Sequence, residues 1–309
     1  MTVQRVKRGK KIILLLEWLT VIATVVLSFR FAREIKDGVL FGMRLGALEV
    51  IPAIFPFFVL SDYICCSGLL DFKKTKKLFE KIFGISGDFC TPFILGCLFG
   101  FPIGAKCCSQ VFSQSSRLRY DCERAVCLSS NPSLSFCAFA VGLGCLSDLK
   151  LGIVIYFSMI LSTILVGLMA RGKCVYSPIS DDIPRQSFDF ATSIKSAGLG
   201  SMAVCSFIAF FSAIVSLVEN LFSSEFAGTV VSCFLEVGNA CSRIGLLGLG
   251  LLPSLMVYGF AIGFSGISVI LQARAALPSD VRISKLCIFK MAEGVVCSVI
   301  TPILYLIIT

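Results

Sequence analysis

Three glycines, a proline and a lysine interrupt an otherwise apolar stretch of the chain. Gly96, Gly100 and Gly104 are four residues apart, so they fall on one helical face, where another backbone can approach closely. Pro102 breaks the hydrogen-bond ladder in that face, and Lys106 follows one turn later. Backbone N–H and C=O groups freed at membrane depth need polar partners, so the stretch predicts the tip of a re-entrant or broken helix that binds a polar ligand.

A second segment, which begins at Gly259, repeats the same Gly-x-x-x-Gly-Phe pattern. Gly263 closes the pattern, and Ser265, Gly266 and Ser268 follow it with small or helix-breaking residues. Paired, glycine-interrupted apolar segments in the two halves of a chain are typical of the substrate site of secondary transporters. The two segments therefore predict one binding site built from both halves.

Polar side chains near these segments are candidates to orient a solute. Asn131 and Ser133 flank Pro132, which frees a carbonyl group; the alternative is a proline kink whose polar groups are satisfied by neighbours. Charge would come from Glu236 or from Lys106, unless Lys106 extends to the cytoplasmic interface instead. The candidate ligand-binding residues are therefore Gly100, Pro102, Gly104, Lys106, Asn131, Ser133, Glu236, Asn239, Gly263, Ser265, Gly266, Ser268 and Gln272.

Catalytic and metal chemistry have little support in the residue types. The chain has no histidine, which removes the commonest general base and metal ligand. Its 16 cysteines contain no C-x-x-C pair and lie mostly in apolar runs, where free cysteine behaves as a small buried hydrophobe. Ala105 stands where a phosphate-binding loop needs glycine before its lysine. We expect no enzyme, no catalytic residue, no metal site and no cofactor.

The composition is that of a polytopic helical membrane protein. Apolar residues make up 56% of the chain and charged residues only 15%. The net charge of +9 comes from 28 Lys and Arg against 19 Asp and Glu, and the basic residues cluster in loops. This distribution favours a topology signal over a nucleic-acid surface.

The hydrophobic pattern predicts an all-α protein with about six to seven spanning helices and two re-entrant helical hairpins in inverted repeats. Spans are expected at 12–29, 39–63, 125–146, 151–170, 196–218 and 285–308, hairpins at 89–112 and 245–275, and interfacial helices at 72–83 and 219–243. The expected domains are an N-terminal basic segment and anchor helix (1–37), a first repeat (38–173), a polar linker (174–195) and a second repeat (196–309). The basic N-terminus is expected in the cytoplasm.

The orientation of the second repeat depends on one segment. If 229–251 spanned the membrane, the repeats would be parallel, and Arg274, Arg282 and Lys285 would lie on the inside. The inverted arrangement leaves these three basic residues outside. We expect the inverted arrangement, because loop charge biases topology without fixing it.

The sequence resembles the nucleoside-recognition, or gate-domain, membrane proteins, and most closely the YlbJ-type sporulation integral membrane proteins of spore-forming bacteria. The resemblance covers roughly residues 38–308, and it rests on 100–106, Glu123, 131–132, 235–239, 263–268 and Gln272. It implies a fold similar to concentrative nucleoside transporters, in which two hairpin tips hold the ligand near the midplane. It also implies a role in endospore formation, in making the cortex, at the cell membrane or a membrane around the forespore.

Two functions from different classes fit these features. The first is a permease for a small polar solute, driven by a coupling ion and opened by one hairpin at a time. The second is a non-transporting scaffold that recruits morphogenesis partners and uses the glycines only for packing. The expected partners are the lipid bilayer, the solute, the ion and a second copy of the chain, without nucleic acid.

Overall fold

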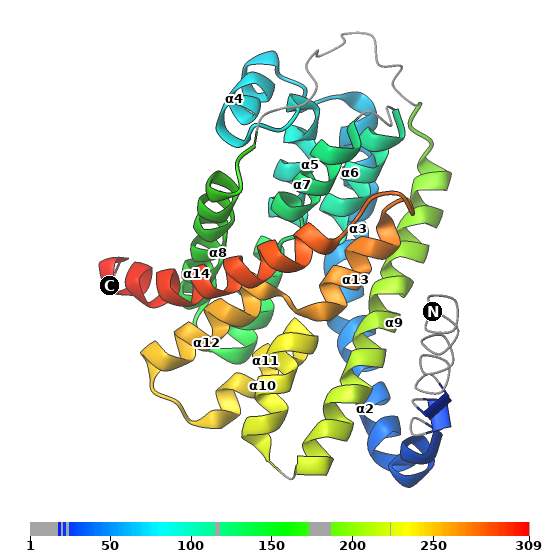
Figure 1. The fold of residues 1–309 in the computed structure, drawn as a ribbon, viewed down its shortest axis with the longest axis vertical. Coiled ribbons are helices and arrows are strands. Elements are labelled where there is room, and N and C mark those ends of the chain that lie inside the picture. Colours follow the sequence, from blue (N-terminus) through cyan, green and yellow to red (C-terminus); the bar gives the residue numbers. More distant parts are fainter. Residues whose placement is uncertain are drawn as a thin grey trace, which may run out of the picture.

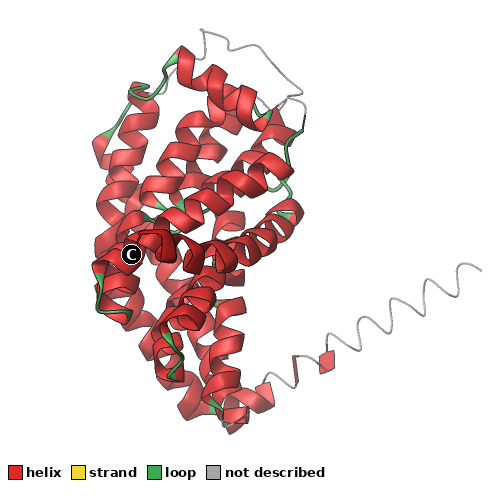
Figure 2. Cartoon of the chain, turned by 90° about the vertical axis from the view of Figure 1, so that its left-hand side faces the viewer, coloured by secondary structure: helices red, strands yellow, loops and turns green. Residues whose placement is uncertain are grey.

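The computed structural model describes residues 18–19, 21–22, 25–114, 118–172, 187–222 and 224–308, and all regular structure in them is helical (Figure 1, Figure 2). Five helices of the described part are long and apolar enough to cross a membrane, or six if one bent pair counts as a span. The all-helical membrane class is thus confirmed, with five to six candidate spans where six to seven were predicted. Half of the anchor at 12–29 and most of the linker at 174–195 lie outside the described residues.

One long helix leads into the first half and packs along another from the second half. It comprises α2 (Ala32–Leu45), the π-helical turn η1 (Gly46–Val50) and α3 (Ile51–Ser67), and it lies beside α9 (Phe190–Phe222) (Figure 1). A Cβ atom on Gly42 would lie 2.6 Å from the Cα atom of Ala209. The glycines of this face therefore set the close approach of the two backbones.

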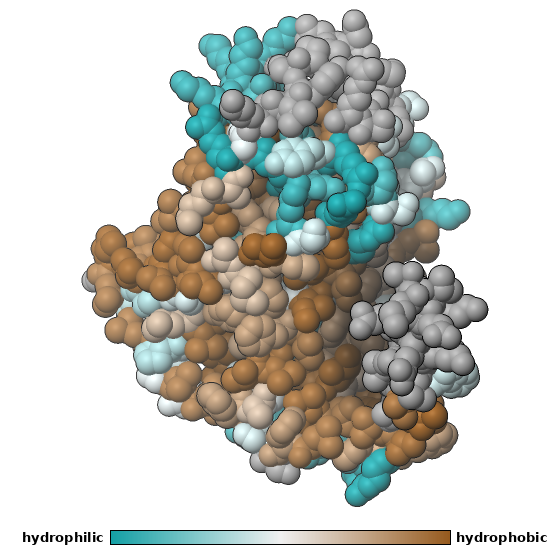
Figure 3. Space-filling model, viewed as in Figure 1, coloured by the Kyte–Doolittle hydropathy of each residue, from teal (hydrophilic) through white to brown (hydrophobic). Residues whose placement is uncertain are grey.

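A short amphipathic helix, α4 (Lys73–Phe83), follows and then bends by 105° into η2 (Gly87–Phe89) and α5 (Cys90–Phe99). It buries Phe79 and Phe83 and exposes Lys73, Lys74 and Lys77. The amphipathic helix predicted at 72–83 is therefore present. It lies at the end of the molecule where hydrophilic side chains gather, while apolar side chains cover most of the visible surface below it (Figure 3).

The chain turns back on itself at the first glycine-proline motif. α5 ends at Phe99 and α6 (Ile103–Gln114) begins three residues after Gly100. The two helices pack against each other, and a Cβ atom on Gly104 would lie 2.9 Å from the Cα atom of Gly96. We call this helix pair the first hairpin and the segment 100–102 its tip.

The next helix is interrupted where the sequence predicts a break. α7 (Arg119–Ser129) ends before Asn131-Pro132, and the π-helical segment η4 (Phe136–Cys145) continues the chain to α8 (Leu149–Met169). At the start of α7, Glu123 is bound by Lys285 Nζ at 2.9 Å and by the backbone N–H of Arg282 at 3.3 Å. Burial raises the pKa of the Glu123 carboxyl, but these partners and Arg119 lower it more, so its pKa lies below the usual value.

The second half has a different hairpin from the one predicted. α10 (Glu225–Leu235) and α11 (Val237–Ile244) pack against each other around a turn at buried Glu236, so the interfacial helix predicted at 219–243 is wrong. We call this pair the second hairpin and Glu236 its tip. The hairpin predicted at 245–275 is also wrong, because Leu251–Ala276 forms one candidate span.

That span is a broken helix. After the 3-10 turn η5 (Gly245–Leu247), α12 (Leu251–Phe264) and α13 (Gly266–Ala276) are separated by Ser265, whose φ is +66°, and α14 (Ser284–Ile308) closes the fold. Gly259 and Gly263 hold α12 against α14, since Cβ atoms there would lie 2.7 Å from the Cys297 carbonyl oxygen and 2.8 Å from its Cβ. The small residues therefore serve packing along α12, and the chain kinks without turning back.

Candidate functional site

In the first half, the hairpin tip rests on the break in the next helix. The Phe101 N–H donates to the Asn131 carbonyl oxygen at 2.8 Å. Gly100 has a φ of +83°, and a Cβ atom there would lie 2.7 Å from the Ser133 backbone nitrogen. Only glycine fits this position without strain, so the motif is needed to seat the tip on the break.

In the second half, the same two features meet in the same way. Gly266 has a φ of +86°, and a Cβ atom there would lie 2.8 Å from the Leu235 carbonyl oxygen and 2.9 Å from the Glu236 nitrogen. The break between α12 and α13 is therefore pressed against the second hairpin tip. Each half thus places freed backbone groups and a hairpin tip side by side.

A cavity of about 40 Å³ lies between these two assemblies. The first contributes Phe101, Ser133 and Phe136, and the second contributes Glu236 and Gln272. The remaining lining is Leu45, Val50, Ile54, Val204, Ile208, Val237 and Gly238. This volume holds a few water molecules, whereas sites that enclose drug-sized ligands measure roughly 300–1,000 Å³. A larger solute would require the hairpins to move apart.

The charged group of the cavity is Glu236, which is 3% exposed. Its Oε2 atom accepts hydrogen bonds from the Asn239 N–H at 2.7 Å and from Asn239 Nδ2 at 2.8 Å, which caps α11. Asn239 Nδ2 also donates to Ser212 Oγ at 2.7 Å. Among the described residues, no ion pair joins a Lys or Arg to this carboxylate.

Gln272 supplies a second acceptor to the same cavity. Its Nε2 atom donates to Ser268 Oγ at 3.1 Å, which fixes the orientation of the amide. Its Oε1 atom is buried and has no hydrogen-bond partner among the described residues. A buried acceptor without a partner costs about 1–3 kcal/mol, so a ligand or water donor in the cavity would recover that free energy.

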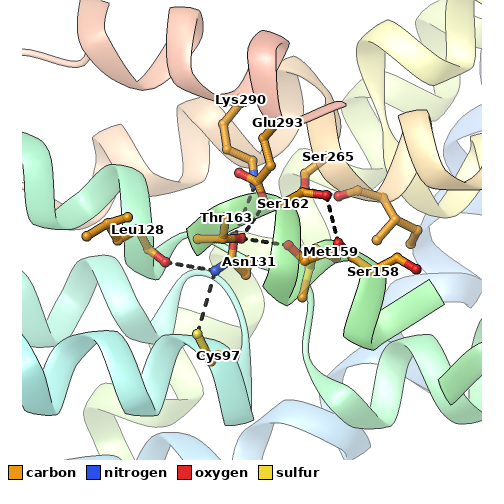
Figure 4. Close-up of polar contacts among 11 residues, drawn as sticks. Cys97, Leu128, Asn131, Ser158, Met159, Ser162, Thr163, Ser265, Lys290 and Glu293 are labelled. Carbon is orange, nitrogen blue, oxygen red and sulfur yellow. Dashed lines mark hydrogen bonds and ion pairs between the residues drawn. The ribbon is translucent and has the colours of Figure 1, made fainter. Parts of the chain in front are cut away.

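A fully buried group of polar side chains surrounds the side chain of Asn131 (Figure 4). Lys290 Nζ binds Glu293 Oε2 at 2.8 Å and Asn131 Oδ1 at 3.2 Å, and Thr163 Oγ1 donates to Glu293 Oε1 at 2.7 Å. Lys290 and Glu293 are both 0% exposed. We call Asn131, Thr163, Lys290 and Glu293 the ionic cluster.

Asn131 links the ionic cluster to the first hairpin. Its side chain accepts from Lys290 on α14, while its backbone carbonyl accepts from Phe101 at the hairpin tip. Its Nδ2 atom donates to the Leu128 carbonyl at 2.8 Å, which holds the end of α7 (Figure 4). A change in the charge state or position of the ion pair would therefore be transmitted through Asn131 to the hairpin tip.

The candidate residues from the sequence fall into three groups. Ser133, Glu236 and Gln272 line the cavity, and Asn239 and Ser268 hold two of these side chains in place. The tips and breaks are formed by Gly100, Pro102, Asn131, Ser265 and Gly266. The remaining candidates, Gly104, Gly263 and Lys106, lie outside this cavity.

The three outlying candidates have structural partners. A Cβ atom on Gly104 would lie 2.0 Å from the Ser129 carbonyl oxygen, so this glycine packs the hairpin against α7. Gly263 packs against α14, as described above. Lys106 forms an ion pair with Asp62 at 2.8 Å, and Ser193 Oγ donates to the same carboxylate at 3.0 Å. Its charge is thus neutralised away from the cavity.

The sequence reasoning missed Thr163, Lys290 and Glu293. Lys290 and Glu293 are one helical turn apart within the apolar run 285–308, and charged residues at that depth usually face the protein interior. That spacing was the available signal for the ion pair. No comparable signal marks Thr163, which is an unremarkable residue of an apolar helix until its partner is placed.

The comparisons with known proteins agree with a membrane protein. The chain is 24% identical over 312 residues to the sporulation integral membrane protein YlbJ of Bacillus subtilis (strain 168), and the alignment covers 85% of this chain and 76% of that protein. No family model and no solved structure matches it. With its five to six candidate spans, the chain is an integral membrane protein distantly similar to a protein of sporulation.

Proposed function

We propose that this chain is a permease-like membrane protein that binds a small polar solute between the two hairpin tips and moves it across the membrane. The observation that carries this proposal is the cavity, which joins a buried carboxylate and an unpartnered amide oxygen at the meeting point of two broken helices. Broken helices around a polar site are the usual way in which transporters expose backbone groups to a solute.

The order of elements supports an inverted repeat. Each half has a long helix, a hairpin, a broken helix and a second long helix: α3, α5–α6, α7–η4 and α8 in the first, and α9, α10–α11, α12–α13 and α14 in the second. If the hairpins enter and leave on one side, the chain crosses three times, in α3, α7–η4 and α8, before α9 begins, so the halves run in opposite directions. This assignment keeps the predicted inversion but places the second re-entrant hairpin at 225–244.

Alternating access follows from this arrangement. Each tip contacts the break of its own half, and the cavity lies between the two assemblies, so moving one tip outward opens the cavity to one side. The ionic cluster holds Asn131 and, through it, the first tip. The proposed cycle has no enzymatic step and is driven by a coupling ion. The resemblance to nucleoside-recognition proteins supports a site between the hairpin tips.

We further propose that the protein acts in endospore formation, at the cell membrane or a membrane around the forespore, with its N-terminus in the cytoplasm. The name of the Bacillus subtilis relative supports the process. The lysines of α4 support a cytoplasmic position for that end of the molecule. The cortex is the spore layer that the resemblance implies.

The test is complementation of a Bacillus subtilis strain that lacks YlbJ and has a measured sporulation defect. The wild-type chain is expected to restore heat-resistant spores, while Asn131→Ala and Glu236→Ala are expected to fail although they reach the membrane in normal amounts. Glu225→Ala is a matched control, since Glu225 is exposed at the other end of the same hairpin.

The competing function is a scaffold that recruits partners without transport. It is favoured if Asn131→Ala and Glu236→Ala both complement fully while neutralising the exposed lysines of α4 abolishes complementation. Full complementation by Glu236→Ala would refute the permease proposal, because the protein would then act in sporulation without the carboxylate of its proposed binding site.

A further inference from the structure

Among the described residues, the cavity is lined by acceptors and by no cationic side chain. The described lining contains one carboxylate, on Glu236, and one amide oxygen without a partner, on Gln272, and it contains no Lys or Arg. Lys106 and Lys290, the lysines near the first tip, are bound to Asp62 and Glu293. An anionic solute would therefore lie beside a buried carboxyl group and find no positive partner among the described side chains.

The carboxylate is only partly neutralised by its surroundings. Glu236 caps α11, and the positive end of that helix favours a negative charge there. The penalty of burying an ion is larger than the stabilisation that a helix end supplies. A cation in the cavity would therefore stabilise the carboxylate, and none of the described side chains provides such a cation.

The orphaned amide points to the same kind of ligand. Gln272 lines the cavity and is 3% exposed, and its Nε2 atom already donates to Ser268, so among the described residues its Oε1 atom is the acceptor that is left for a ligand. Phe101 and Phe136 also line the cavity, and aromatic rings favour cations. The site is therefore complementary to a ligand that carries positive charge and N–H or O–H groups.

We propose that the solute is a small organic cation with N–H or O–H donors, whose charge is bound by Glu236 and whose donor is accepted by Gln272 Oε1. This inference rests on the proposed function for its site, but it names the chemical class of the ligand. The cavity of about 40 Å³ admits only a compact cation without movement of the hairpins.

The test uses the purified full chain in detergent and three matched probes. Ethanolamine is a cation with both kinds of donor, ethylene glycol is its neutral counterpart, and glycolate is an anion of similar size. A thiol-reactive dye reports thermal unfolding, because most described cysteines are buried. Ionic strength is held constant, so that general salt effects cancel.

At ten times its dissociation constant, ethanolamine is expected to raise the Tm by about 2–5 °C, and the other probes by much less. Glu236→Gln should abolish the shift, Gln272→Leu should reduce it, and Glu225→Gln should leave it unchanged. An equal shift with ethylene glycol, a larger one with glycolate, an unchanged shift in a folded Glu236→Gln, or no shift with any probe at 50 mM would each overturn the inference. If Glu236→Gln does not fold, the inference is tested by the Tm shifts of the three probes on the wild-type chain and by the reduced ethanolamine shift of Gln272→Leu.

The outcome is separable from that of the proposed function. If the wild-type chain binds ethanolamine preferentially but Glu236→Ala complements fully, the inferred ligand class stands and the permease proposal fails. If complementation requires Glu236 but the chain binds glycolate preferentially, the permease proposal stands and the inferred ligand class fails.

Discussion

The ion pair between Lys290 and Glu293 offers the sharpest test of the structure. Both side chains are 0% exposed and their charged atoms are 2.8 Å apart, within the long candidate span α14. We consider Lys290→Met, Glu293→Leu and the double variant, since these changes remove the charges and keep similar volumes. Lys77→Met on the exposed face of α4 is the control.

The magnitudes follow from what each change leaves behind. Removing one partner of a buried pair leaves the other charge uncompensated, which destabilises by about 3–5 kcal/mol, whereas replacing both with apolar residues is often neutral or stabilising. In the double variant Thr163 keeps its hydrogen bond to the Met159 carbonyl at 3.0 Å, and Asn131 Oδ1 keeps only the longer one from Thr163 at 3.4 Å. We therefore expect a loss of about 0–2 kcal/mol for the double variant, and a coupling energy of about 4 kcal/mol or more.

Thermal and denaturant unfolding of the four purified proteins, followed with the thiol-reactive dye, gives this coupling energy. Lys77→Met is expected to change stability by less than about 0.5 kcal/mol. A double variant whose loss equals the sum of the two single losses would refute the reasoning, because the two charges would then not interact.

Three further predictions test the packing and the charged end of the molecule. Gly104→Ala should lower the free energy of unfolding by about 1–3 kcal/mol because its Cβ would meet a carbonyl oxygen at 2.0 Å, whereas Gly198→Ala, with open space around it, should be neutral or slightly stabilising in the same unfolding assay. An added copper–phenanthroline oxidant should cross-link Cys65 to Cys107, whose sulfur atoms are 3.5 Å apart, and mass spectrometry of peptides should find no such link after Cys107→Ser. Because the pKa of Glu123 is lowered in the folded protein, its ion pairs stabilise the fold above the unfolded pKa of about 4.3. This stabilisation is lost as the pH falls through the folded pKa. The free energy of unfolding of Glu123→Gln should therefore depend less on pH in the acid range than that of the wild-type chain.

The sequence located the helix interruptions better than it assigned their geometry. The breaks at Gly100–Pro102, Asn131–Pro132 and Ser265–Gly266 are all present. A break that turns the chain back and one that only kinks it need the same residue types, because both require freed backbone groups and positive φ angles. Whether α12 and α13 turn back depends on the packing of α12 against α14, which the motif itself does not contain.

The second hairpin was missed because its tip has no glycine or proline. Glu236 ends α10 and caps α11 with its own side chain, so the turn is stabilised by a capping bond to Asn239. The polar residues of 219–243 looked like a solvated face, yet Glu236 and Asn239 are both buried. Gly266 of α13 lies against the Glu236 backbone, and Asn239 donates to Ser212 on α9. Composition alone cannot separate a polar residue at an interface from one at a buried site.

The most direct measurement of the central claim is an uptake screen with proteoliposomes. Vesicles that contain the wild-type chain, Glu236→Gln or Glu225→Gln are exposed to a small-molecule extract of sporulating cells, and mass spectrometry identifies what each vesicle preparation retains. We predict that at least one donor-bearing cation accumulates in the wild-type and Glu225→Gln vesicles and is absent from Glu236→Gln vesicles. Identical contents in all three preparations and in vesicles without protein would contradict the account.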